Sequence, residues 1–287
     1  MMSLQEGIVY GPVRSRRLGQ SLGINILPRN VKLCTFNCSY CQYGWTRTGA
    51  RSARGIGDVW PSPASVAKAV GLRLRRAVAS GELVHRLTLA GNGEPTLHPE
   101  FAEVVARLQR LRDEVAPDLP IAILSNSTTL DRPAVVAALG RLDERYMKLD
   151  AGETAILRRV NSATVSVEQI VEGLRRLHDV VIQAMFVRDR LGRIDNAGDV
   201  AVASWVGALT RVAPCRVQVY SIDRPPAWPY LQAVPTARLE EIVRRVQGAG
   251  IAAEAFGATP VHATPVHATP VHAALPAVVP ATARSRR

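Results

Sequence analysis

Cysteines, aromatic residues and long apolar runs are all scarce in this 287-residue sequence. It contains four cysteines, and aromatic residues make up 5% of it. We find no run of the roughly 18 apolar residues that a membrane-spanning helix needs, and no signal peptide. These absences argue against a membrane protein and against a small secreted domain held by disulfides. A reducing cytoplasm is therefore the expected compartment. The length suits one large α/β domain or two smaller ones, and nothing in the sequence demands two.

The chain is strongly basic, with a formal net charge of +12. Such a balance is typical of proteins that bind polyanions, although an arginine-rich composition produces it without any nucleic-acid partner. RNA is therefore one candidate substrate among several.

Three of the four cysteines lie together at C-x3-C-x2-C spacing, as Cys34, Cys38 and Cys41. Thiolates this close can converge on one soft metal centre, and three ligands leave a coordination position for another molecule. A structural zinc site would need a second ligand pair, which the sequence lacks. An iron–sulfur cluster therefore fits best. The fourth cysteine, Cys215, begins an apolar run, where a lone cysteine is usually a small buried hydrophobe; a distant ligand is the alternative.

The cysteine segment resembles the signature of the radical S-adenosylmethionine (SAM) superfamily, with Tyr40 as its aromatic residue. The resemblance implies that the three cysteines hold a [4Fe–4S] cluster, and that the iron without a protein ligand binds the amino and carboxyl groups of S-adenosyl-L-methionine. It also implies reductive cleavage of SAM, hydrogen abstraction from a substrate, and an electron donor such as flavodoxin or ferredoxin. The chain would then be an Fe–S oxidoreductase.

A second motif, Gly91-Asn92-Gly93-Glu94, follows a short apolar strand. Glycines let the backbone approach a ligand closely, and a neighbouring carboxylate can pair with an ammonium group. An ordinary glycine-rich turn is the alternative. The segment resembles the Gly-Gly-Glu segment of the superfamily, which implies that these four residues bind SAM and that Glu94 holds its amino group. His98 is expected to belong to the entry of the next helix.

Apolar strands alternate with helices along most of the chain, which predicts six β/α units. Strands are expected near residues 22, 86, 121, 146, 181 and 216. Helices are expected at residues 62–80, 99–115, 132–142, 153–160, 165–178, 199–212 and 236–247. Right-handed connections would curl such units into an incomplete parallel (β/α)6 barrel, which is also the fold that the resemblance implies for a core domain over residues 1–257.

Polar residues stand where several of these strands end, the place where such barrels bind ligands. By resemblance, Ser125, Asn126 and Asp150 would contact the ribose or methionine part of SAM. For Asn126 and Asp150, local capping or turn formation is the alternative. Gln183 lies inside an apolar strand, so its amide must find a partner in the barrel or at the cofactor.

Three segments fall outside this alternation. Residues 11–19 carry Arg14, Arg16 and Arg17, which form either a solvated edge or phosphate contacts. Residues 44–60 predict a long loop that closes over the cluster or holds substrate. Residues 258–287 contain three Ala-Thr-Pro-Val-His repeats, which predict an extended, disordered tail; a spacer and a histidine metal site are the two interpretations.

A narrower resemblance covers residues 8–257. Residues 10–19, 91–98 and 223–226 resemble those of the wyosine-synthesis-like Fe–S oxidoreductases, which are similar to the enzymes that build the wyosine base on tRNA. The wyosine enzymes use further N-terminal cysteines for a second cluster, and this chain has none before Cys34. The resemblance therefore implies the cofactors and leaves the substrate open. A non-catalytic electron-transfer or regulatory Fe–S protein is the alternative function.

Overall fold

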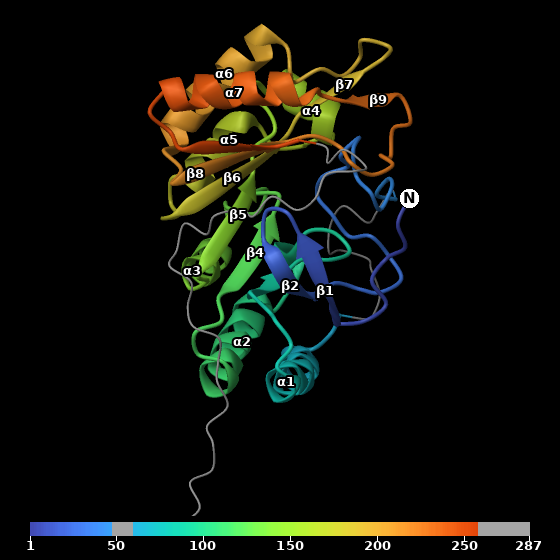
Figure 1. The fold of residues 1–287 in the computed structure, drawn as a ribbon, viewed down its shortest axis with the longest axis vertical. Helices are drawn as coiled ribbons and strands as arrows, with labels where there is room; N and C mark the ends of the chain where they lie inside the picture. Colours follow the sequence, from blue (N-terminus) through green and yellow to red (C-terminus); the bar gives the residue numbers. More distant parts are fainter. Residues whose placement is uncertain (48–59, 258–287) are drawn as a thin grey trace, which may run out of the picture.

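A computed structural model describes residues 1–47 and 60–257, and its main element is one curved sheet (Figure 1). The strands are β1 (Val9–Ser15), β2 (Gly19–Ile24), β3 (Arg86–Leu89), β4 (Ile121–Ser125), β5 (Glu144–Lys148), β6 (Val180–Met185), β7 (Val187–Asp189), β8 (Arg216–Tyr220), β9 (Leu231–Ala233) and β10 (Ala253–Phe256). The helices are α1 (Pro63–Ser80), the 3-10 helix η1 (Pro95–Leu97), α2 (Phe101–Val115), α3 (Pro133–Gly140), α4 (Thr154–Asn161), α5 (Val167–Leu174), α6 (Asp199–Val212) and α7 (Thr236–Gly248).

In the described ranges the large sheet has eight strands in the order β1-β2-β3-β4-β5-β6-β8-β10. Within this sheet, as far as the structure describes the chain, only β1 runs antiparallel to its neighbour, and every other pair is parallel. The six expected parallel strands are therefore present in sequence order, with β10 added at one edge. Because β1 and β10 remain the two edges, the barrel is incomplete, as predicted.

The two faces of the sheet have different partners. Ile121 and Ile123 of β4 belong to the main core, which they form with the apolar faces of the surrounding helices. Ala122 lies on the opposite face, in a small inner cluster with Tyr146 and Val181. This alternation follows from the period of two in a strand and separates a helix-covered outer face from the barrel interior.

Helix boundaries follow local capping. The Ser62 hydroxyl accepts a hydrogen bond from the Ser65 amide, and Pro63 occupies the first turn of α1, as expected. Ser166 and Gln169 form a capping box at the start of α5. The expected helix over 165–178 is shorter, since α5 ends at Leu174.

The basic segment over residues 11–19 was not predicted as a strand, yet most of it forms β1 and the turn into β2. From this turn the Arg16 guanidinium reaches across the barrel opening. It pairs with Asp223 at 2.7 Å, beyond β8, and donates to the Gly257 carbonyl beyond β10. The first and third segments of the narrower resemblance therefore meet and bridge the open side of the barrel.

One further expectation, for Cys215, was wrong. Cys215 is exposed rather than buried, and its thiol donates to the Val180 carbonyl at 3.2 Å. Cys215 lies just before β8, at the amino end of the parallel strands. The three-cysteine loop follows β2, at their carboxyl end, so Cys215 is not a distant ligand of the same metal centre. The short strands β7 and β9 pair with each other outside the main sheet.

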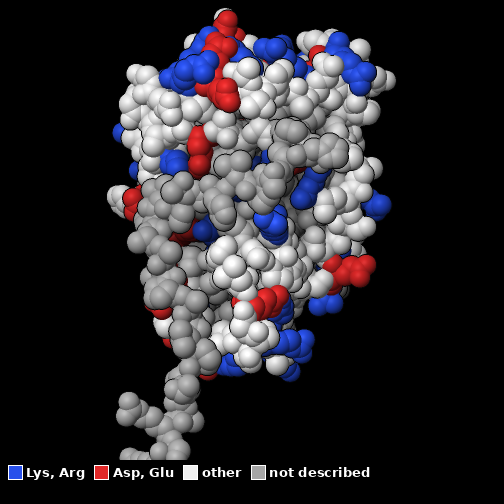
Figure 2. Space-filling model, viewed as in Figure 1, with Lys and Arg blue, Asp and Glu red and all other residues white. Residues whose placement is uncertain are grey.

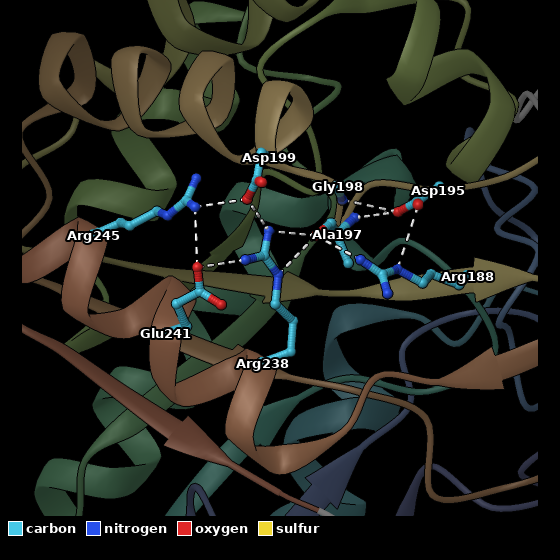
Figure 3. Close-up of polar contacts among 8 residues, drawn as sticks. All are labelled: Arg188, Asp195, Ala197, Gly198, Asp199, Arg238, Glu241 and Arg245. Atoms are coloured by element: carbon cyan, nitrogen blue, oxygen red, sulfur yellow. Dashed lines mark hydrogen bonds and ion pairs between the residues drawn. The ribbon is translucent and has the colours of Figure 1, made fainter.

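An ion-pair network joins α7 to the start of α6 (Figure 3). The Arg238 guanidinium donates to the Ala197 carbonyl and pairs with Asp199 at 2.8 Å and Glu241 at 2.7 Å. Arg245 reaches the same two carboxylates. These contacts lie on the outer layer and fix the helices that back β8 and β10.

Charged side chains of both signs are interspersed on the face shown in Figure 2, and the visible described residues form no broad basic patch there. None of the helices in the described ranges combines the length and apolar character needed to cross a bilayer. The predicted 258–287 tail and most of the predicted 44–60 loop lie outside the described residues.

Candidate active site

The three clustered cysteines lie on the loop that follows β2, at the carboxyl end of the parallel strands. All three thiols are free and partly buried. Two successive turns shape the loop, because the Cys41 amide donates to the Cys38 carbonyl and the Gly44 amide donates to the Cys41 carbonyl, each at 3.0 Å. The spacing in sequence therefore places the cysteines on consecutive bends of one loop.

The glycine motif is joined directly to this loop. Leu33, just before the first cysteine, forms a parallel bridge with Gly93. The Leu33 amide donates to the Asn92 carbonyl at 2.8 Å, and the Glu94 amide donates to the Leu33 carbonyl at 2.9 Å. Gly93 has φ +143, and a Cβ there would lie 1.7 Å from the Leu33 carbonyl oxygen. Gly93 therefore allows the two motifs to pair.

Gly91 and Asn92 hold neighbouring backbone in place. A Cβ on Gly91 would lie 2.3 Å from the Asn25 side chain, so this position also requires a residue without one. The Asn92 amide group is buried, donates to the Gln5 and Pro28 carbonyls, and accepts from the Gln5 amide. Its contacts are thus structural, and its proposed contact with SAM stays a prediction.

Glu94 presents a buried carboxylate at the centre of the site. Its Oε1 atom accepts from the Thr96 amide and hydroxyl and from the Ser125 hydroxyl at 3.0 Å; its Oε2 atom accepts from the Asn126 amide at 2.6 Å. Burial raises the pKa of Glu94, although these hydrogen bonds lower it. No cation pairs with this carboxylate among the described residues.

Asn126 joins the carboxylate to the cysteine loop. Its side-chain nitrogen lies 3.5 Å from Cys34 Sγ and 2.8 Å from the Thr35 hydroxyl. Its side-chain oxygen accepts from the Thr128 amide at 3.1 Å, so the local turn is present as well. Ser125, Asn126 and Glu94 are therefore brought together, and their contact with SAM stays a prediction.

A second group gathers around Cys38. The Asp150 carboxylate accepts hydrogen bonds from the Tyr40 hydroxyl and, at 2.8 Å, from Asn161. The Asn161 side-chain nitrogen also lies 3.2 Å from Cys38 Sγ. The other carboxylate oxygen of Asp150 accepts from the Met185 amide at 2.9 Å. Tyr40 and Asp150 thus lie beside a cysteine ligand candidate, and Asn161 was missed because nothing in its helical sequence distinguished it.

Lys148 was also missed, although a charged residue in an apolar strand was a visible signal. It ends β5, and its ammonium lies 3.3 Å from Asp150 and 3.1 Å from the Tyr220 hydroxyl. Burial lowers its pKa, but Asp150 and Tyr220 outweigh burial and the net pKa is raised.

Gln183 lies inside the barrel, where its side-chain amide donates a hydrogen bond to Gln218 at 2.9 Å. Its polar group is therefore satisfied within the protein.

The donor set fits a cluster better than a single ion. Among the described residues, no three His, Cys, Asp or Glu side chains converge on one mononuclear site. A cubane cluster does not require that convergence, because each thiolate binds its own iron. Burial raises the pKa of Cys34 and raises that of Cys38 to about 11, so both would be neutral thiols without a metal.

Positive charge and N–H groups accompany the thiols. The Asn126 and Asn161 amides point at two of the sulfur atoms. The buried Lys32 ammonium lies near enough to Cys34 to lower that pKa in part, and within the described ranges it pairs with no carboxylate. Such donors and charges stabilise thiolates bound to iron.

Comparisons with known proteins point to one family. The sequence model of the Radical SAM superfamily matches residues 31–189. A UPF0026 protein of Helicobacter pylori is 30% identical over 222 residues, covering 76% of this chain and 67% of the relative. A UPF0026 protein of Methanocaldococcus jannaschii is 34% identical over 174 residues, covering 60% and 50%. The chain thus spans only half the length of the M. jannaschii relative.

Solved structures share the fold at low sequence identity. A radical SAM methyltransferase from Sphaerobacter thermophilus aligns with TM-score 0.60 and 16% identity, over 83% of this chain and 66% of the other. Streptococcus suis SuiB bound to S-adenosylmethionine gives 0.57 and 14%, over 82% and 50%. Archaeal TYW1 gives 0.51 and 12%, over 79% and 71%.

Proposed function

The chain belongs to the radical SAM superfamily, and we propose that it is an enzyme that cleaves S-adenosyl-L-methionine reductively to begin hydrogen abstraction on a substrate. Cys34, Cys38 and Cys41 would hold a [4Fe–4S] cluster. When bound, that cluster supplies one electron that breaks a carbon–sulfur bond of SAM, giving methionine and a 5′-deoxyadenosyl radical. The family match supports the cofactors.

One observation carries this proposal. A buried carboxylate with no cationic partner among the described residues, Glu94, is joined through Asn126 to the loop of three free cysteines. A buried carboxylate is costly unless a positive group compensates it. The ammonium group of the methionine part of SAM has the charge needed, and Glu94 would orient it beside the cysteines.

The surrounding residues would hold the reacting groups in place. Ser125 donates to Glu94 and so fixes the rotamer of the carboxylate. Asp150 would either contact SAM or act as the acceptor that positions Tyr40 and Asn161. An external one-electron donor such as flavodoxin or ferredoxin would supply reducing equivalents, because the reaction consumes an electron.

The test uses protein reconstituted anaerobically with iron and sulfide, reduced, and incubated with SAM. We expect slow formation of 5′-deoxyadenosine by the wild type and by Cys215→Ala, which removes the exposed cysteine at the far end of the strands. We expect none from Cys38→Ala. Equal product from the two cysteine variants would refute the assignment of Cys38.

RNA is one candidate substrate because of the net charge of +12. Binding that neutralises phosphates weakens steeply with salt, so RNA affinity independent of salt would remove this candidate. A purely electron-transferring or regulatory cluster protein is the remaining alternative. It predicts a cluster that forms normally and yields no 5′-deoxyadenosine with SAM.

A further inference from the structure

The turn between β1 and β2 places Arg17 against Tyr220, the last residue of β8. The Arg17 guanidinium carbon lies 3.7 Å from the centre of the Tyr220 ring. The turn itself is firmly held, because the Ser15 hydroxyl accepts from the Arg17 and Leu18 amides and Leu18 packs into the inner barrel cluster. Arg17 is thus positioned by its neighbours on both sides.

Lys148 contacts the same tyrosine. Its ammonium is 3.1 Å from the Tyr220 hydroxyl and 5.4 Å from the centre of that ring, and it lies 5.0 Å from the centre of the Tyr40 ring. Tyr40 stands between Cys38 and Cys41 in sequence. Two cations and two aromatic rings therefore connect the barrel opening to the cysteine loop.

The charges of this group do not balance. Lys148 is paired with Asp150, whose carboxylate also accepts from Tyr40, Asn161 and the Met185 amide. Arg17 has no carboxylate partner within the part of the chain that the structure describes, and its Nε atom is buried without a hydrogen-bond acceptor there. One positive charge is therefore left over beside Tyr220.

A role in closing the barrel does not explain the position of Arg17. Its neighbour Arg16 already makes the closing contacts, to Asp223 and to the Gly257 carbonyl. A guanidinium stacked on an aromatic ring keeps its N–H edge directed outward, and that edge binds carboxylate and phosphate oxygens in a paired geometry. Because its charge has no carboxylate partner within the described ranges, an anionic group that arrives with a ligand is favoured there.

We propose that Arg17, supported by Tyr220 and Lys148, binds an oxyanion group of the substrate, a phosphate or a carboxylate. This assignment rests on the proposed function, because it supposes that a substrate approaches the cysteine loop through the barrel. It directs the search for the substrate to acidic molecules. The ammonium group of SAM is assigned to Glu94, which is joined through Asn126 to Cys34, whereas Lys148 lies beside Tyr40.

The experiment uses anaerobically reconstituted protein with saturating SAM and no reductant, so that no turnover occurs. The thermal unfolding midpoint is followed against sodium phosphate, sodium succinate and sodium chloride at matched ionic strength. We expect a saturable rise with phosphate or succinate beyond that with chloride. A larger effect of phosphate would identify a phosphate site, and a larger effect of succinate a carboxylate site.

Arg17→Gln should raise the half-saturating anion concentration about 10- to 100-fold, the loss expected for one charge-assisted hydrogen bond. The matched control is Arg14→Gln, an exposed arginine of the same hairpin, which should change it less than about twofold. Lys148→Arg keeps the charge and should keep most of the effect. Cluster absorbance and SAM affinity are measured for each variant.

Three outcomes would overturn the proposal. The first is a wild-type protein whose unfolding midpoint shows no saturable rise beyond that with chloride. The second is an equal loss of anion affinity in Arg17→Gln and Arg14→Gln. The third is a loss of SAM affinity in Arg17→Gln with unchanged anion binding. Because the measurement needs no SAM cleavage, its failure is distinguishable from failure of the proposed function. Failure to form 5′-deoxyadenosine, with anion binding intact, would contradict the proposed function and leave Arg17 as an oxyanion site without an assigned reaction.

Discussion

Gly93 and Leu33 face each other across a parallel β-bridge, and this contact joins the glycine motif to the cysteine loop. A Cβ on Gly93 would lie 1.7 Å from the Leu33 carbonyl oxygen, and φ at Gly93 is +143. Both facts exclude any other residue at this position without movement of the backbone. The bridge sets the position of Glu94 relative to Cys34.

Gly93→Ala should therefore lower the free energy of unfolding by about 2–4 kcal/mol, because steric overlap adds to backbone strain. The control is Gly207→Ala, in the interior of α6 with open space around it, which should raise stability by about 0.5–1 kcal/mol. Denaturant unfolding of both variants is the measurement. A neutral Gly93→Ala would show that the loops are not tightly paired.

Glu94→Gln should weaken SAM binding about 10- to 100-fold, because it removes the negative charge of the side chain while keeping its size. Glu100→Gln, an exposed neighbour just before α2, is the control and should bind SAM normally. Equilibrium titration of the reconstituted proteins measures both affinities. Equal affinities would mean that SAM is held elsewhere.

Asn161→Ala should lower the reduction potential of the cluster, because hydrogen bonds to cysteine sulfur favour the reduced, more negative state. The Asn161 amide lies 3.2 Å from Cys38 Sγ. One hydrogen bond of about 1 kcal/mol corresponds to about 40 mV for one electron. Redox titration by EPR measures the shift, and Asn196→Ala, which loses other hydrogen bonds around Asp150, is the control. Equal shifts in the two variants would assign the effect to general loosening of the site.

His98 should make the stability pH-dependent. Its Nε2 atom donates to the Pro61 carbonyl and its Nδ1 atom accepts from the Glu100 amide, which requires the neutral ring. Burial lowers the pKa of His98. The folded state therefore binds this proton less readily than the unfolded state, and stability falls as pH drops below the ordinary histidine value, by at most about 1.4 kcal/mol per pH unit.

The difference in free energy of unfolding between the wild type and His98→Gln should thus shrink as the pH is lowered from 7.5 to 5.5. Denaturant unfolding at a series of pH values gives the difference directly. The control is His178→Gln, at an exposed position outside the core. A difference between wild type and His98→Gln that stays constant with pH would contradict this interpretation.

Much of the fold was predictable because periodicity and capping are local. Ile121 and Ile123 alternate with Ala122, which indicates a strand, and Ser62 followed by Pro63 indicates the start of α1. The strand β1 was missed because its sequence holds glycine, proline and arginine, and its pairing with β2 depends on the hairpin as a whole. Strand propensity alone does not predict such a strand.

The site was predictable where several informative residues stand together in sequence. Cys34, Cys38 and Cys41 share one short segment, and Glu94 follows two glycines. Asn161 was not predicted as a site residue, and for Arg17 the sequence left a solvated edge and a phosphate contact open. Their partners Cys38 and Tyr220 are distant in sequence, and only the curvature of the sheet brings each pair together. Exposure of Cys215 likewise depends on what packs beside the start of β8.

The most direct test of the account is the EPR spectrum of the reduced, reconstituted protein before and after SAM is added. The account predicts a cluster signal that shifts on addition of SAM in the wild type and in Cys215→Ala, with a shift that needs higher SAM concentrations in Glu94→Gln. A fully formed cluster whose spectrum is indifferent to SAM would contradict it. The chain would then hold a cluster for electron transfer or regulation.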